Sequence, residues 1–153
     1  MPAPIFYLED LRLERDFTCG RFRLTRAEII EFARRFDPQP FHIDEDAARE
    51  SYFQGLCASG VHTQAAAIGL MVRAIADVAV VAGGSLDQAR FLIPTRPDTD
   101  YDVAARWVSA RPSARNPARG VASLAGTARR ADGVMVMEFG VTYVVARRPS
   151  CSV

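Results

Sequence analysis

Residues 36–44 read Phe-Asp-Pro-Gln-Pro-Phe-His-Ile-Asp, and residues 57–63 read Cys-Ala-Ser-Gly-Val-His-Thr. The first stretch is a proline-punctuated loop that carries one carboxylate, Asp37, and one imidazole, His42. The second is a turn of small residues that opens, at Gly60, onto a long apolar segment. An acid–base pair beside a helix N-terminus suits chemistry on a polarised carbonyl, because the free N–H groups there stabilise developing negative charge. We therefore interpret the rest of the chain as the scaffold that holds these two stretches together.

The helix expected before the loop has clear start and stop residues. Thr25 and Glu28 have the T-x-x-E spacing of a capping box, which predicts a helix start at Thr25. Apolar residues at helical spacing then continue to Phe36. Pro38 disfavours helical geometry at Asp37, so we expect the helix to end there and leave the Asp37 carboxylate free to face a cleft.

Two further helices are expected after the loop. Asp44 is a plausible N-cap for a short helix through Glu50. Residues 60–82 are apolar almost all round, which predicts one long buried helix that Gly83-Gly84 ends. Its main apolar face is expected at 4-3-4-3-4 spacing, with an Arg73–Asp77 pair on the polar stripe. The positions of that face are Val61, Ala65, Ile68, Val72, Ile75 and Ala79, and it is widened by Ala67, Leu70, Met71, Ala74 and Val78.

After Gly84 the hydrophobic period changes from about 3.6 to 2, which predicts strands. We expect strands near residues 86–93, 101–107, 121–127 and 134–145, besides a weaker one at 17–24. Asp132-Gly133 predicts a hairpin before the last strand. Helices followed by antiparallel strands indicate an α+β domain whose sheet curls around the long helix. Such a sheet leaves an edge strand open, and edge-to-edge dimerisation is one way to protect it.

Composition narrows the class of protein. A chain of 153 residues is most simply one domain, with a core over about residues 17–146. The net charge of +1 and the scattered arginines give no nucleic-acid footprint. Cys19, Cys57 and Cys151 share no metal spacing, and we interpret them as reduced thiols of a cytoplasmic protein. We expect no signal peptide and no membrane span.

The motif Asp37-x-Gln39-Pro40-x-His42-x-Asp44, followed by Ala58-Ser59-Gly60 before a buried helix, resembles the MaoC-like dehydratases. That family includes the (R)-specific enoyl-CoA hydratases and has the hotdog fold, in which an antiparallel sheet wraps a long central helix. Its motif is D-x-N-P-x-H-x-D followed by a glycine that opens the central helix. The resemblance covers about residues 17–146 and implies an acyl dehydratase of fatty-acid metabolism.

The resemblance implies roles for three residues. Asp37 and His42 match the pair that activates water for addition across the double bond of an enoyl thioester. Gly60 matches the residue whose backbone N–H holds the thioester oxygen. It also implies an acyl-CoA or acyl carrier protein thioester as substrate, no further cofactor, and a homodimer or higher homo-oligomer.

Three positions depart from the family pattern, and one of them, Asp98 in place of a common glycine after Pro97, has no clear consequence. Gln39 replaces the motif asparagine, and Ser59 stands where better-known hydratases have a histidine before the glycine. Neither change removes a proton-transfer group, so we expect activity to survive. We also expect Gln39, Ser59, His62 and Phe53 to contact the substrate.

Other readings of the same residues remain open. A hotdog thioesterase usually needs an acid on the central helix, whereas the first half of this one offers only Gln64. A non-catalytic acyl-thioester-binding domain is the reading from a different class. We expect no metal, because two histidines without zinc-like spacing do not make a ligand set.

Overall fold

The structure is a computed structural model that describes residues 6–149. Cys151 and the last residues of the chain lie outside this range. The elements in chain order are η1 (Leu8–Asp10), β1 (Asp16–Arg23), α1 (Arg26–Phe36), α2 (Pro40–Ile43), α3 (Glu45–Glu50), α4 (Gly60–Ala74), β2 (Val80–Phe91), β3 (Asp100–Pro112), β4 (Arg119–Arg130) and β5 (Met135–Ala146).

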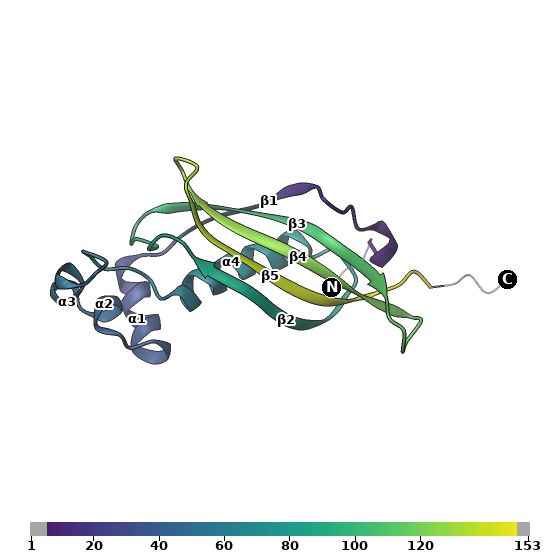
Figure 1. Ribbon diagram of the computed structural model, residues 1–153, viewed down its shortest axis with the longest axis horizontal. Helices are drawn as coiled ribbons and strands as arrows, with labels where there is room; N and C mark the ends of the chain where they lie inside the picture. The colour runs from purple at the N-terminus through teal and green to yellow at the C-terminus, as the bar shows by residue number, and fades with distance from the viewer. Residues whose placement is uncertain (1–5, 150–153) are drawn as a thin grey trace.

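One antiparallel sheet with the strand order β1-β3-β4-β5-β2 forms the body of the molecule. Helix α4 lies along one face of this sheet, and α1, α2 and α3 gather at one end (Figure 1). The predicted α+β class, with a sheet around a long helix, is confirmed. No helix within residues 6–149 is both long and apolar enough to cross a membrane.

The core lies between α4 and the inward face of the three central strands. Strand β5 alternates as predicted, and its inward positions from Met137 to Val145 are buried. From α4, Ala67 and Met71 pack against this face. Gly126 of β4 has no room for a side chain, because a Cβ there would lie 2.7 Å from the sulfur of Met71. The helix and the sheet are therefore packed closely at this point.

The local stop and start residues predicted from the sequence are present. Thr25 and Glu28 form the capping box of α1. The carboxylate of Asp44 accepts a hydrogen bond from the N–H of Ala47 at 2.8 Å and so caps α3. Gly133 has a φ of 86°, in the left-handed region that glycine tolerates, within the predicted hairpin.

The predicted end of the long helix was wrong. Helix α4 ends at Ala74, and residues 80–91 form strand β2, so Gly83-Gly84 lie inside a strand. The run Val80-Val81 is β-branched, and β2 gains a ladder of hydrogen bonds to β5 that a helix could not make. Asp77 lies beyond the helix, and within residues 6–149 no ion pair joins it to Arg73.

The predicted buried face of this helix was also wrong in part. Ala67 and Met71 are buried as predicted, together with Thr63, whereas Val61 is 58% exposed and Val72 is 48% exposed. The cause is the position of the helix, which packs mainly against β1, β3 and β4 and leaves the β2 side uncovered. A helix that is apolar all round carries no internal sign of which face meets the sheet.

Candidate active site

Asp37 is held at the point where α1 ends. It is the C-cap residue, with φ −155° and ψ 69°, and its N–H donates to the carbonyl oxygen of Ala33 at 2.9 Å. Pro38 prevents the helix from continuing, so the chain turns here and the carboxylate faces a cavity, as predicted. The side-chain amide of Gln39 donates to Oδ1 of Asp37 at 2.9 Å, which fixes the rotamer of the carboxylate.

His42 lies in the short helix α2 and is 6% exposed. Its Nδ1 atom is 2.7 Å from the carbonyl oxygen of Cys57. A carbonyl oxygen only accepts, so Nδ1 carries the proton and donates this bond. The neutral ring then presents the lone pair of Nε2 on its other side, 3.5 Å from Oδ2 of Asp37.

Two acceptors therefore face one another across a short gap. A water molecule placed above Oδ2 of Asp37 and Nε2 of His42 can donate one O–H to each of them, which would polarise its oxygen as a nucleophile. The same two groups can accept the proton that the water gives up and deliver it to a neighbouring atom of the reactant. The arrangement suits the general acid–base activation of a single water molecule.

The Asp37 carboxylate is kept ionised by its neighbours. The Ser59 hydroxyl is the largest cause of its lowered pKa, and burial opposes it by favouring the neutral form. The hydrogen bond from Gln39 lowers the pKa of Asp37 further. Asp37 is thus an acceptor at neutral pH, which is the state that water activation requires.

Gly60 is the first residue of α4, and Ser59 is its N-cap. The Ser59 hydroxyl accepts from the N–H of Val61 at 3.3 Å, while the Gly60 N–H makes no hydrogen bond within the described part of the chain. A Cβ at position 60 would lie 2.8 Å from the ring of Phe91. Glycine therefore lets the Phe91 ring approach the helix start, next to an unpaired donor at the positive end of the α4 dipole.

A cavity of about 600 Å³ joins these groups. Asp37, Gln39, His42, Phe53 and Gly60 all line it, so five of the seven residues predicted for the site lie together. The rest of the wall is largely apolar and aromatic. It includes Phe41, Tyr52, Val61, Phe91, Leu92 and Ile93.

The other two predicted residues lie differently. Ser59 is fully buried behind Asp37 and acts on its carboxylate rather than on the cavity. His62 faces α1, where its ring stacks on Phe32 at 4.3 Å between centroids. It does not line this cavity, and burial lowers the pKa of His62. The structure therefore gives His62 no contact with the space that holds Asp37 and His42.

Cys57 lies against His42 with its carbonyl oxygen and also with its thiol, whose Sγ is 3.7 Å from Nδ1. It is buried, and burial raises the pKa of its thiol, so the sulfur is a poor nucleophile. Its carbonyl oxygen is the acceptor that fixes the tautomer of His42.

Arg96 is a site-supporting residue that sequence reasoning missed. Its guanidinium donates to the carbonyl oxygen of Gly55 at 2.7 Å and to that of Leu56 at 3.2 Å. The adjacent Thr95 carbonyl accepts from the N–H of Ala58 at 2.8 Å. These bonds hold the loop that leads to Gly60. A single arginine inside the Pro94–Pro97 turn was the only sign of this role in the sequence.

Comparison with known proteins identifies relatives of this chain. The MaoC-like domain family model matches residues 12–125. A MaoC-like dehydratase from Rhodospirillum rubrum has 36% sequence identity to this chain, and its crystal structure matches with a TM-score of 0.86. The match covers 95% of this chain and 99% of that one.

Two further relatives are more distant. The (R)-hydratase PhaJ1 of Pseudomonas aeruginosa is 16% identical with a TM-score of 0.71, over 94% of this chain and 87% of that one, and it supports the fold alone. The uncharacterized protein YdeM of Bacillus subtilis (strain 168) is 29% identical over 94 residues, which are 61% of this chain and 67% of that protein. The hotdog fold predicted from the sequence is thereby confirmed.

Proposed function

This chain belongs to the MaoC-like domain family, and on that premise we propose that it is an (R)-specific enoyl-CoA hydratase. In the reverse direction the same reaction makes it an acyl dehydratase. The observation that carries the proposal is the 3.5 Å approach of His42 Nε2 to Asp37 Oδ2 in the wall of an apolar cavity. An acid–base pair beside an apolar cavity fits a substrate that has an apolar acyl chain and a reactive double bond.

The proposed reaction adds water across the C2=C3 bond of an enoyl thioester. Asp37 and His42 accept hydrogen bonds from one water, and its oxygen bonds to C3 as one O–H bond breaks. The π electrons move to C2 and onto the thioester oxygen as an enolate. The proton held by the pair then bonds to C2 on the same face, which restores both side chains to their starting state. Such catalysis contributes roughly 10²–10⁴-fold.

The Gly60 N–H is the proposed donor to the enolate oxygen. Its position at the start of α4 places an unpaired backbone donor and the helix dipole beside the cavity. A donor aimed at charge that develops in the transition state is worth roughly 10²–10³-fold. No metal or further cofactor is required by this scheme.

The apolar wall supports an acyl thioester as substrate, carried by CoA or by acyl carrier protein. Phe53 is proposed to border the acyl chain. Gln39 and Ser59 are proposed to act on substrate through Asp37, whose carboxylate they hold. The described thiols Cys19 and Cys57 are free, which supports a reducing compartment such as the cytoplasm.

We also propose that the working form is a homodimer joined through β2. Every residue of β2 is exposed, and its outer edge has no partner strand within residues 6–149. Leu86 pairs in register with the buried Val141, so its side chain lies on the α4 side of the sheet, yet it is 61% exposed. A second copy would cover this open edge together with Val61 and Phe91, which also line the cavity.

The test is the loss of conjugated-enoyl absorbance when purified protein is added to enoyl-CoA esters of short, long and branched chains. We expect rapid loss with the parent and collapse in both Asp37→Asn and His42→Ala. Asp46→Asn is the matched control, because Asp46 is an exposed carboxylate outside the cavity. Chiral analysis of the product checks the (R) configuration.

A negative result would be equally informative. Release of free thiol without loss of the double bond would indicate a thioesterase. Neither reaction, in a folded protein that still binds CoA esters, would indicate a non-catalytic acyl-binding domain.

A further inference from the structure

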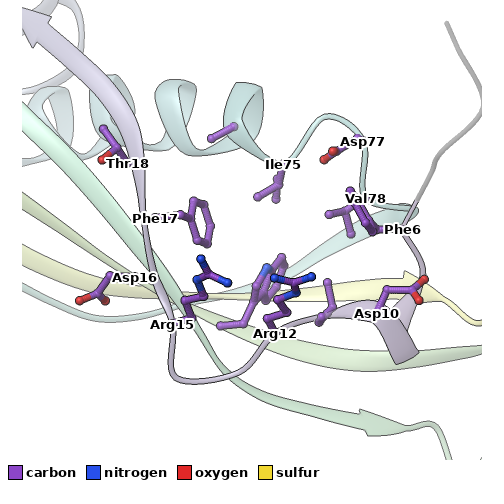
Figure 2. A pocket seen from close by; sticks show the side chains of 13 residues that line it. Phe6, Asp10, Arg12, Arg15, Asp16, Phe17, Thr18, Ile75, Asp77 and Val78 are labelled. Carbon is purple, nitrogen blue, oxygen red and sulfur yellow. The ribbon is translucent and has the colours of Figure 1, made fainter.

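A second cavity, of about 510 Å³, lies near the opposite end of α4 (Figure 2). It is open to solvent and is bordered by the loop before β1, by the start of β1 and by residues 74–78, which include the end of α4 and the segment that follows. It shares no lining residue with the candidate active site. The 15 residues of α4 separate the two cavities by roughly 20 Å.

The walls of this cavity are mainly apolar. Phe17 and Ile75 stand on one side of it in Figure 2, and Val78 and Phe6 stand at one end. Trp107 from β3 is part of the lining. These surfaces suit an aliphatic or aromatic body, which gains free energy when it leaves water.

Two arginine side chains, both solvent-exposed, border the same apolar surface. The side chains of Arg12 and Arg15 reach from the loop into the cavity (Figure 2). Within residues 6–149 neither has an ion-pair partner. Two like charges at one cavity repel each other, and an anion placed between them removes that cost.

The carboxylates nearby do not neutralise this charge. Asp10 is paired with Arg148 at 2.7 Å, and Asp16 is paired with Arg106 at 2.7 Å. Asp77 also lines the cavity and has no ion-pair partner among the described residues. Among the lining side chains that have no ion-pair partner within residues 6–149, the two arginines stand against one carboxylate, while Arg106 serves both Asp16 and Glu14.

The loop that carries the two arginines is anchored to the sheet. The N–H of Glu14 donates to the carbonyl oxygen of Trp107 at 2.8 Å, and Leu13 forms an isolated bridge with the same residue. Glu14 has a φ of 56°, a left-handed conformation that costs energy outside glycine and that these contacts hold in place. Arg12 and Arg15 are therefore presented from a fixed turn.

We propose that this cavity is a binding site for a small amphipathic anion, with an apolar body against Phe17, Ile75 and Trp107 and a carboxylate or phosphate group held by Arg12 and Arg15. Guanidinium groups bind both kinds of anion through paired, charge-assisted hydrogen bonds. The site is separate from the proposed hydration chemistry and does not depend on it.

Trp107 makes the test direct, because it is the only tryptophan in the chain and lines the cavity. Tryptophan fluorescence is followed while full-length protein is titrated with decanoate, decyl phosphate, decanol or inorganic phosphate. We expect saturable changes with decanoate and decyl phosphate, and much weaker binding of decanol and inorganic phosphate. The stronger of the two anions identifies the head group.

Variants locate the site. Arg12→Gln with Arg15→Gln should weaken binding of the preferred anion by about tenfold or more, since charge-assisted hydrogen bonds are lost. Arg115→Gln with Arg119→Gln, two exposed arginines outside the cavity, should leave the affinity unchanged. Asp77→Asn should tighten binding, and Asp37→Asn should leave it unchanged.

Three outcomes would overturn the proposal. Decanol that binds as well as decanoate would show an apolar cleft without an anion site. An unchanged affinity in the Arg12/Arg15 double variant would remove the arginines from the site. No saturable change with any probe would mean that the cavity binds no ligand of this class.

Discussion

Nε2 of His42 lies 3.5 Å from Oδ2 of Asp37, while Nδ1–H of the same ring donates a hydrogen bond to the carbonyl oxygen of Cys57. The two residues are only five positions apart, but the ring is oriented by a residue fifteen positions further along the chain. The acceptor pair therefore depends on the loop at residues 53–59 as much as on the motif itself.

Ser59→Ala should change the pH dependence of hydration. The Ser59 hydroxyl lowers the pKa of Asp37, so its removal raises that pKa toward the ordinary value. As pH falls, the variant carboxylate is protonated earlier, and the acid limb of the kcat/KM profile should move to higher pH. The measurement is kcat/KM against pH for parent and variant on one enoyl-CoA.

Thr25→Ala is the control for that experiment. Both changes remove a helix N-cap, which costs about 1 kcal/mol of stability. Of the two residues only Ser59 lowers the pKa of Asp37, so Thr25→Ala should destabilise the protein without moving the acid limb. An acid limb that stays in place in Ser59→Ala would contradict the role given to its hydroxyl.

Gly60→Ala should impair activity more than stability. The added Cβ would lie 2.8 Å from the Phe91 ring, which is on an exposed strand and can move away. The displaced ring changes the cavity wall beside the oxyanion donor, and we expect kcat/KM to fall on the order of 100-fold. Steady-state kinetics and thermal unfolding together separate the two effects.

Gly69→Ala is the matched change in the same helix. A Cβ there meets only the tip of Arg73, at 3.7 Å, so it fits. Stability should rise by about 0.5–1 kcal/mol because a glycine in a helix interior is replaced by alanine. Activity should stay at the parent level, and equal losses in both variants would argue against a special role for position 60.

Leu86→Arg should break the proposed dimer. It puts a charge at the exposed edge strand, where a second copy would otherwise bury an apolar side chain. Light scattering after size-exclusion chromatography should give the mass of a dimer for the parent and of a monomer for the variant. Val108→Arg, an exposed apolar position on β3, should remain dimeric. A monomeric parent would exclude this assembly.

Arg96→Lys should destabilise the loop that leads to Gly60. A lysine keeps the charge but not the planar fork, whose Nη1 donates to the carbonyl oxygens of Gly55 and Leu56 while Nη2 donates to that of Phe53. We expect a loss of about 1–3 kcal/mol in unfolding free energy, measured by urea denaturation. Activity should also fall, because the loop carries the Cys57 carbonyl and the start of α4. Arg49→Lys, on the exposed side of α3, should change neither.

Local chemistry was enough to predict the site motif and several elements. The Thr25 cap, the stop at Asp37 and the alternation of β5 all depend on residues within a few positions of one another. Asp37, His42 and Gly60 lie together as predicted because the motif, the two short helices and the turn before α4 leave little freedom between them.

Only the tertiary structure decided the features that depend on distant partners. Residues 80–82 are compatible with a helix by composition, and pairing with β5 makes them a strand. His62 and Val61 are neighbours on one apolar helix, and the position of α4 on the sheet turns His62 toward Phe32 and leaves Val61 exposed. Hydrogen bonds within a turn depend on residues that are adjacent in the sequence, and these can be predicted from it. The face that a helix buries depends on its contacts with the whole sheet, which only the tertiary structure shows.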